Sequence, residues 1–180
     1  MLIKHQTQPC TVSCVATCLA MLVDEPVQGL IERFHARYRA GATSMRQLLD
    51  ELEVPFRSFD SCDLPMLNES GAYLISVPSL NIQGGMHQII IEVDATGVDY
   101  FVHDPVKGLE GKMYYGRRNE TFPEAGEVEL NGFVIDAFID ALWLGQRDER
   151  LSNQSGATEQ ACGSCDNAGS TEHSGQPATA

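Results

Sequence analysis

No long apolar run occurs in this sequence. No stretch approaches the roughly 18 consecutive apolar residues that a membrane-spanning helix needs, and Met1 to His5 do not lead into the apolar core of a secretory signal. We therefore expect a cytoplasmic protein with no membrane partner. Secretion without a cleavable signal, and delivery to another cell by that route, stay open.

Basic residues are also scarce. Lysine and arginine together number 12 against 25 aspartates and glutamates, which gives a formal net charge of -13. No basic stripe is present to neutralise phosphate groups, and an anionic surface repels them. We therefore expect no nucleic-acid partner, whereas a neutral or basic peptide is compatible with this charge. The sequence does not specify an oligomeric state.

The cysteines are too unevenly spread for a disulfide framework. The six are Cys10, Cys14, Cys18, Cys62, Cys162 and Cys165. Small disulfide-stabilised domains space their cysteines through the whole fold, so we expect reduced thiols here. The last two form a single CxxC, which without a second pair does not define a metal or redox site. No metal and no cofactor is expected, and a role for this CxxC is left open.

The end of the sequence has little to bury. From about Gln146 onward it consists mainly of Ser, Gly, Asn, Gln, Ala and Thr, and such a segment does not offset its ordering entropy. We expect a disordered polar tail over residues 146–180. Residues 1–145 then form one domain, since the hydrophobic fraction of 43% is enough for one core.

Apolar periodicity predicts three helices near the start of the chain. They are expected over residues 14–23, 27–38 and 45–52. The first is apolar nearly all round, which indicates a buried helix, and Ser13 is placed to cap it. The third begins with Ser44 and Gln47, whose spacing is that of a capping box.

Further along the chain the pattern changes to short strand-like runs bounded by turn residues. Strands are expected over residues 73–77, 87–93, 99–103 and 112–115. Residues 134–144 are apolar and fit either a helix or a strand. Helices first and strands after predict an α+β architecture in which N-terminal helices pack on an antiparallel β-sheet.

Cys14 is the leading candidate for a catalytic nucleophile. With Ser13 as the N-cap, Cys14 occupies the first helical turn, where free backbone N–H groups and the helix dipole stabilise a thiolate. Cys18 lies one turn further in, and Cys10 precedes the helix. Position alone therefore ranks Cys14 first, although an isolated cysteine in an apolar helix is more often a small buried residue.

His87 and Asp104 are the candidates for a base and its orienter. His87 opens one expected strand, Asp104 follows the next, and the turn signal at 94–97 lies between them. A two-residue turn at the centre of that segment places His87 directly opposite Asp104, with Cβ atoms about 4.5–5.5 Å apart. A carboxylate there would hold the tautomer and orientation of the imidazole.

The other histidines are less well placed for this role. The same register pairs His103 with Gln88 and turns it to the face opposite Asp104. We therefore expect His103 to be a surface or core-satisfying residue. His5 and His35 have no carboxylate so placed.

Three blocks of the sequence occur in an order and spacing that resemble a known family. Gln8 precedes Cys14 by six positions, His87 opens an apolar strand, and residues 104–108 read Asp-Pro-Val-Lys-Gly. Together they resemble the papain-like cysteine peptidases, and within them the double-glycine leader peptidases that process bacteriocins. The similarity covers about residues 8–108.

This resemblance implies a papain-like fold and a role for each residue. Cys14 would attack a carbonyl and form a thioester, with His87 as the base and Asp104 as its orienter. The side-chain amide of Gln8 and the backbone N–H of Cys14 would bind the oxyanion, and one such donor is typically worth about 2.7–4 kcal/mol of barrier.

The sequence also departs from the family. Ser13 and Val15 flank the nucleophile where the family usually has Asp and Gly, which leaves the choice of substrate open. No GxxxxGK[ST] run occurs, so this is not the peptidase part of an exporter.

These patterns predict a cysteine peptidase that cleaves a peptide or isopeptide bond in a protein or peptide substrate. One alternative uses the same thioester in an amidase or acyl transferase, including a transglutaminase-like enzyme, and the sequence does not separate water from an amine as acceptor. A second alternative is not enzymatic. It is a metal-binding protein using Cys10, Cys14 and Cys18, or an inactive binding module.

Overall fold

A computed structural model describes residues 1–59, 66–117 and 124–147 of the chain. The chain divides into two units, Met1–Asp148 and Glu149–Ala180, and every described residue belongs to the first. Cys62, the CxxC pair and the predicted tail from residue 148 onward lie outside the described residues. Residues 146 and 147, which were assigned to that tail, belong to a helix over residues 141–147.

The three predicted N-terminal helices are all present. They are α1 (Cys14–Val23), the continuous run of α2 (Val27–Leu30), η1 (Ile31–His35) and α3 (Ala36–Arg39), and α4 (Met45–Glu51). η1 is a π-helical turn within the second helix. Within the described ranges, none of the helices is both long enough and apolar enough to cross a membrane.

The two predicted helix caps have different outcomes. Ser44 and Gln47 form the capping box, with the Gln47 side chain accepting from the Ser44 N–H at 2.9 Å and the Ser44 hydroxyl accepting from the Gln47 N–H at 3.4 Å. Ser13 stands at the N-cap of α1, but its side chain makes no capping bond. That prediction was wrong because the Ser13 hydroxyl turns back and donates to the carbonyl of Cys10 at 3.0 Å.

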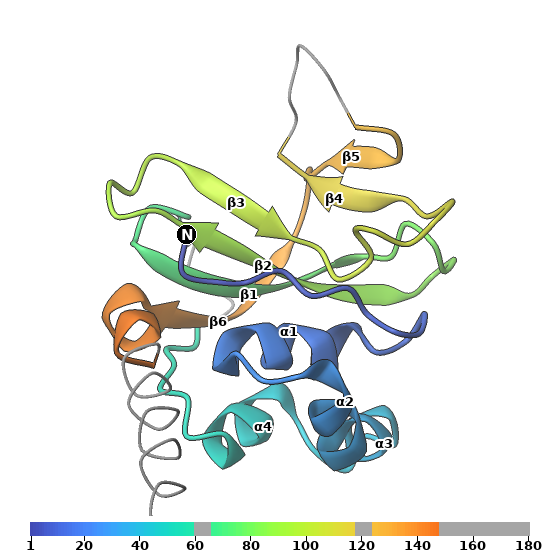
Figure 1. Ribbon diagram of the computed structural model, residues 1–180, viewed down its shortest axis with the longest axis horizontal. Helices are drawn as coiled ribbons and strands as arrows, with labels where there is room; N and C mark the ends of the chain where they lie inside the picture. The colour runs from blue at the N-terminus through green and yellow to red at the C-terminus, as the bar shows by residue number, and fades with distance from the viewer. Residues whose placement is uncertain (60–65, 118–123, 148–180) are drawn as a thin grey trace, which may run out of the picture. The chain divides into compact units, whose positions relative to one another are not determined.

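An antiparallel sheet of four strands lies beside the helices, in the order β3-β2-β1-β6. Its strands are β1 (Gly71–Pro78), β2 (Met86–Val93), β3 (Tyr100–His103) and β6 (Val134–Asp140). A separate parallel pair consists of β4 (Tyr114–Gly116) and β5 (Glu127–Glu129). Figure 1 shows α1 to α4 on one face of the sheet and β4 and β5 beyond the other. The predicted α+β class is confirmed.

The ambiguous segment over residues 134–144 contains both kinds of structure. It is a strand as far as Asp140 and a helix from residue 141. The carboxylate of Asp140 accepts from the N–H of Leu142 at 2.7 Å, so a short polar side chain satisfies a free donor at the point of change.

The register between β2 and β3 differs from the prediction by two residues. His103 lies opposite Ile90 instead of Gln88. The turn is longer than expected because the carboxylate of Asp94 accepts from the backbone N–H groups of Thr96, Val98 and Asp99, at 3.1, 3.3 and 3.2 Å. A shift of two residues keeps every side chain on its predicted face, since side chains alternate with a period of two.

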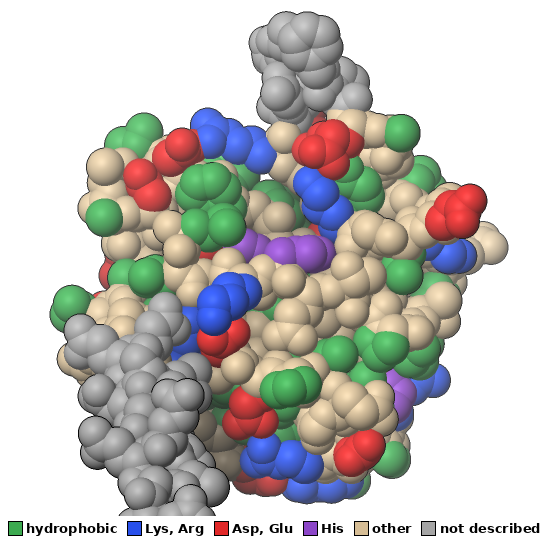
Figure 2. All heavy atoms as spheres, in the orientation of Figure 1, with side chains coloured by type: hydrophobic (Ala, Val, Ile, Leu, Met, Phe, Trp, Pro, Cys, Tyr) green, Lys and Arg blue, Asp and Glu red, His purple; other side chains and the backbone are tan. Residues whose placement is uncertain are grey.

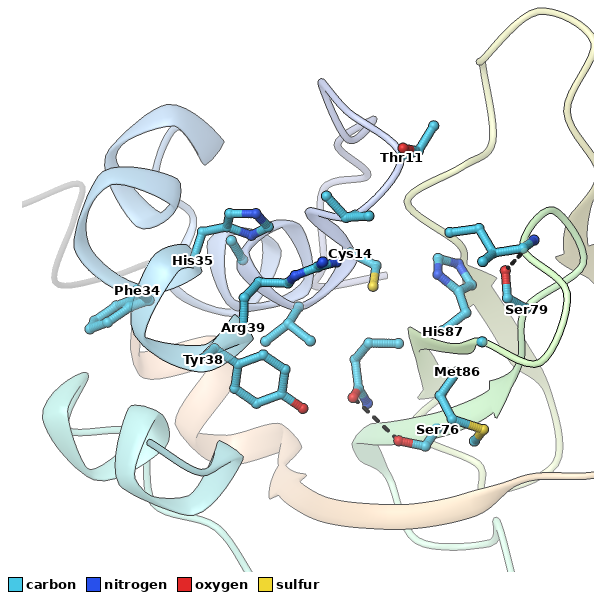
Figure 3. Close-up of a pocket in the computed structure, with 16 residues that line it drawn as sticks. Thr11, Cys14, Phe34, His35, Tyr38, Arg39, Ser76, Ser79, Met86 and His87 are labelled. Atoms are coloured by element: carbon cyan, nitrogen blue, oxygen red, sulfur yellow. Dashed lines mark hydrogen bonds between the residues drawn. The ribbon is translucent and has the colours of Figure 1, made fainter. Parts of the chain in front are cut away.

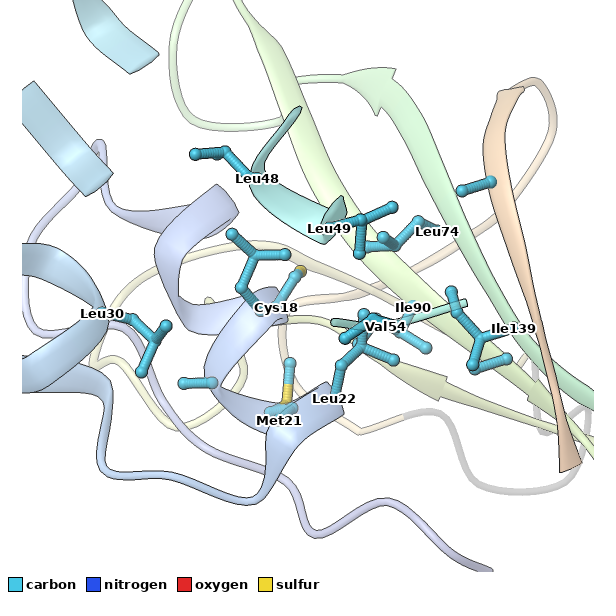
Figure 4. Close-up of a cluster of buried hydrophobic side chains, with 14 of the residues drawn as sticks. Cys18, Met21, Leu22, Leu30, Leu48, Leu49, Val54, Leu74, Ile90 and Ile139 are labelled. Carbon is cyan, nitrogen blue, oxygen red and sulfur yellow. The ribbon is translucent and has the colours of Figure 1, made fainter. Parts of the chain in front are cut away.

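Two buried clusters pack against the two faces of the sheet. The cluster on the helical side joins α1 and α4 to inward-facing strand residues and includes Cys18, Leu22, Leu49, Leu74 and Ile90 (Figure 4). The other cluster joins the opposite face of the sheet to side chains of β4 and β5. The apolar character of α1 on all sides therefore follows from its burial between the sheet and the other helices.

Gly71 offers a test of the close contact between β1 and β6. A Cβ at Gly71 would lie 2.3 Å from the carbonyl oxygen of Ile139, at a φ of +150°. We expect Gly71→Ala to lower the free energy of unfolding by about 2 kcal/mol or more, because backbone must move. Gly29→Ala is the control: it is helical, has open space and should raise stability by up to about 1 kcal/mol. Equal effects in denaturant unfolding would contradict this packing.

Candidate active site

Cys14 is the first residue of α1 and is partly exposed at a cleft. Burial raises the pKa of its thiol. Burial is outweighed by the combined effect of a hydrogen bond to His87, the charge of His87, and the backbone N–H groups of Gln88 and Val15. The pKa of Cys14 is therefore lowered overall. The position at the helix start agrees with this direction, because first-turn N–H groups have no partner within the helix.

His87 lies on β2 and faces Cys14 across the cleft, as Figure 3 shows. Its Nε2 atom is 2.7 Å from Oδ1 of Asp104, which leaves Nδ1 for the cysteine. Burial lowers the pKa of His87. The hydrogen bonds to Asp104 and to Cys14 outweigh it and raise the pKa of His87 to about 9. A thiolate and an imidazolium therefore stabilise each other here.

Asp104 directly follows β3 and is 1% exposed. Besides His87, its carboxylate accepts from the backbone N–H of Val106 at 2.8 Å and from that of Tyr115 at 2.7 Å. Two backbone donors hold the buried carboxylate rigidly, so it fixes the plane and tautomer of the imidazole. The predicted contact of His87 with Asp104 is present, although the two are diagonal neighbours and not directly opposite.

Gln8 is 2% exposed and its backbone N–H donates to the carbonyl of Pro105 at 2.8 Å. It lines a small pocket together with His87 and Thr11, both of which also line the cleft. Among the described residues, its side-chain oxygen is buried with no hydrogen-bond partner. Such a group is costly to bury, and buried unpaired polar groups often mark functional sites.

The cleft beside Cys14 has a volume of about 300 Å³. It lies between the helices and the ends of β1 and β2, with apolar walls that include Val15, Phe34 and Met86. Val15, where the resembling family has glycine, therefore borders the space next to the nucleophile. The rim also carries the guanidinium of Arg39.

A polar network next to the cleft was not predicted from the sequence. The carboxylate of Asp136 accepts from the Ser76 hydroxyl at 2.8 Å and from the Gln88 side-chain amide at 3.0 Å. The network fixes Gln88, whose backbone N–H faces the Cys14 sulfur. The network forms at a β-bulge. β1 pairs Leu74 with Ala137 and the next residue with Ile135, so Asp136 has no partner in the register. Simple alternation of side chains does not reveal a bulge.

The neighbouring cysteines differ from Cys14. Cys18 is fully buried, its thiol donates to the carbonyl of Gln88 at 3.3 Å, and burial raises its pKa. Cys10 is exposed, and a hydrogen bond with Ser13 lowers its pKa. A lowered pKa therefore separates Cys14 from Cys18 but not from Cys10. What distinguishes Cys14 is the imidazole of His87.

His103 was expected to be a surface or core-satisfying residue, and the structure places it in a buried position. It is 3% exposed, and its Nε2 atom lies 2.9 Å from Oε2 of Glu92. It lies on the face opposite Asp104, as predicted, and has no contact with Cys14 among the described residues.

Comparison of the chain with family models, with curated proteins and with solved structures finds no match in any of the three. The interpretation of the site therefore depends on its own geometry.

Alkylation tests whether His87 activates Cys14. At neutral pH, iodoacetamide should modify Cys14 in the native chain, and His87→Ala should slow this several-fold, because His87 lowers the pKa of Cys14 and the thiolate is the nucleophilic form. Cys10 is the internal control, because Ser13 lowers its pKa and its rate should not change. Tandem mass spectrometry of the peptide distinguishes the sites. Equal slowing at both cysteines, or none at Cys14, would contradict the pairing.

Proposed function

We propose that this chain is a papain-like cysteine hydrolase that cleaves a peptide or isopeptide bond. The observation that carries the proposal is the line of contacts from Cys14 to His87 to Asp104 beside an open cleft. In this arrangement the thiolate form of Cys14 and the imidazolium form of His87 are favoured. This is the charge state in which a cysteine attacks and a histidine donates a proton.

In the first half of the reaction the Cys14 sulfur attacks the carbonyl carbon of the scissile bond. The carbonyl oxygen becomes an oxyanion, which accepts hydrogen bonds from the Gln8 side-chain amide and the Cys14 backbone N–H. As the C–N bond breaks, the imidazolium of His87 gives its proton to the leaving amine. A thioester on Cys14 and a neutral His87 remain.

In the second half a water molecule replaces the amine. His87 takes one proton from the water, and the oxygen attacks the thioester carbonyl through a second oxyanion. The C–S bond then breaks, the acid is released, and Cys14 returns as a thiolate beside the imidazolium. Asp104 remains a carboxylate throughout and keeps the imidazole aligned for both proton transfers.

The arrangement of elements supports the papain-like assignment. The nucleophile begins a buried helix, the histidine lies on an antiparallel strand, and the aspartate follows the next strand. The glutamine that precedes the helix lies at the same site. These are the places that the resembling family gives to its functional residues.

The metal-binding alternative is less well supported. Cys18 is fully buried and its thiol is already bonded to the carbonyl of Gln88, while Cys10 is exposed in the loop before α1. Over residues 1–59, 66–117 and 124–147, no group of three histidine, cysteine, aspartate or glutamate side chains is placed to bind a metal ion. Cys14 and His87 face each other and the cleft instead.

A peptide library assayed by mass spectrometry tests the proposed function. The full chain should produce new peptide termini, and Cys14→Ala should produce none. Gln8→Ala should slow cleavage by about a hundredfold to a thousandfold, the usual loss for one oxyanion donor. Gln28→Ala is the matched control: its amide bonds the carboxylate of Glu32 on the exposed face of the second helix, away from the site, and cleavage should not change. Products joined to an added amine, or cleavage that survives Cys14→Ala, would contradict a Cys14 hydrolase.

A further inference from the structure

A second buried carboxylate–imidazole pair lies near the site and has no part in the mechanism above. Glu92 on β2 and His103 at the end of β3 are each 3% exposed, and they are joined by the hydrogen bond of 2.9 Å. A buried carboxylate is costly unless it is paired and fully hydrogen-bonded. Its remaining partners therefore indicate what the pair holds in place.

The remaining partners of Glu92 belong to the N-terminal segment, defined here as residues 1–8. The ammonium group of Met1 lies 3.9 Å from Oε1 of Glu92. The backbone N–H of Leu2 donates to one carboxylate oxygen of Glu92, and the N–H of Ile3 donates to the other at 3.3 Å. Ile3 is itself 1% exposed within the core. The start of the segment is thus fixed against the sheet by a charged acceptor, and hydrogen bonds to charged groups are the stronger ones.

The middle of the segment is held at two places. Lys4 bonds the Asp24 carboxylate at 2.6 Å and Gln6 bonds the Glu25 carbonyl at 2.9 Å, and the other contacts are with His103 and the loop that follows it. The ring of His5 stacks on that of His103, with centroids 6.4 Å apart and 20° between the planes. The Lys107 carbonyl lies 3.3 Å from Nε2 of His5 and accepts from the Thr7 hydroxyl at 2.9 Å. In Figure 2, histidine atoms lie in the middle of the face on view, between mixed acidic and basic side chains.

The end of the segment carries Gln8 to the active site. Its backbone N–H donates to Pro105, the residue after Asp104, so the segment is tied to the loop that begins with the catalytic aspartate. The side-chain oxygen of Gln8 has no such tie, since it is buried and has no partner among the described residues. The position of the Gln8 amide is therefore set by the backbone of the N-terminal segment.

We propose that Glu92 and His103 are a positioning pair that holds the N-terminal segment and, through it, places the Gln8 amide at the oxyanion. This inference rests on the proposed function. Side-chain alternation makes the arrangement compact: His103 and Asp104 are consecutive and face opposite sides of the sheet, so one strand end serves both pairs. Asp104 orients the base, while His103 and Glu92 orient the oxyanion donor.

Two reactions of Cys14 separate this role from a general structural one. Acylation by p-nitrophenyl acetate forms an oxyanion and needs Gln8, whereas alkylation by iodoacetamide forms none and needs only the thiolate. In the full chain carrying Cys10→Ser, we expect Glu92→Gln to slow acylation about tenfold or more. The rate of alkylation should change by no more than about twofold and its pH profile should not shift, because the His87–Asp104 pair is unchanged. In a chain that already carries Gln8→Ala, adding Glu92→Gln should cause no further loss of acylation rate.

Control variants keep the test decisive. Glu51→Gln makes the same chemical change at an exposed pair with Arg37 and should change neither reaction. If Glu92→Gln does not fold, His5→Ala removes an exposed ring that stacks on His103 and lies beside the Lys107 carbonyl, and it should slow acylation in the same selective way.

The outcomes distinguish the two proposals. Unchanged acylation in Glu92→Gln, a parallel loss of alkylation, or an equal further loss in the Gln8→Ala background would overturn the positioning role alone. If Gln8→Ala itself acylates at the native rate, then the oxyanion role of Gln8 and the positioning role are both wrong.

Discussion

The hydrogen bond between His87 and Asp104 joins strand β2 to the loop after β3, and the rest of the site depends on it. The Asp104 carboxylate is buried and accepts hydrogen bonds from two backbone N–H groups, one in its own turn and one of Tyr115 on β4. The small parallel pair β4–β5 thus supplies one of the donors that hold the carboxylate in place. Because the imidazole is fixed, the direction in which it meets Cys14 is fixed as well.

The three cysteines at the start of the chain show how strongly surroundings control one side chain. Cys18, one turn into α1, is enclosed by the core and its pKa is raised. Cys10 is exposed and bonded to Ser13, which lowers its pKa without placing a base beside it. Cys14 alone among these three combines a lowered pKa, access to the cleft and an imidazole partner. That combination, and not the helix start alone, is what distinguishes Cys14 as the proposed nucleophile.

Much of this site was predictable from the sequence because the relevant signals are local. Apolar periodicity located the helices, and the alternation of side chains placed His87 and Asp104 on one face. That inference survived a register error of two residues, since two is the period of a strand. An error of one residue would have separated them. The contact was therefore predicted correctly from a turn that was too short.

Other features depend on tertiary contacts that no local pattern records. The longer turn arises because the Asp94 carboxylate gathers three backbone N–H groups, and the β-bulge at Asp136 appears only when two distant strands pair. The hydroxyl of Ser13 donates to the Cys10 carbonyl and makes no capping bond. The role of Glu92 was also hidden, because its partners at residues 2 and 3 are about ninety positions away in the sequence.

The most direct test of the account is the titration of the His87 imidazole, followed by NMR in the native chain and in Cys14→Ser. The folded pKa of about 9 lies above the ordinary value of 6.5, so the imidazolium should persist through neutral pH and lose its proton only as the pH rises through about 9. Replacing Cys14 by serine removes one of the groups that raise this pKa, so the titration should move to lower pH. A His87 that titrates near 6.5 in both proteins would contradict the thiolate–imidazolium pair on which the proposed chemistry depends.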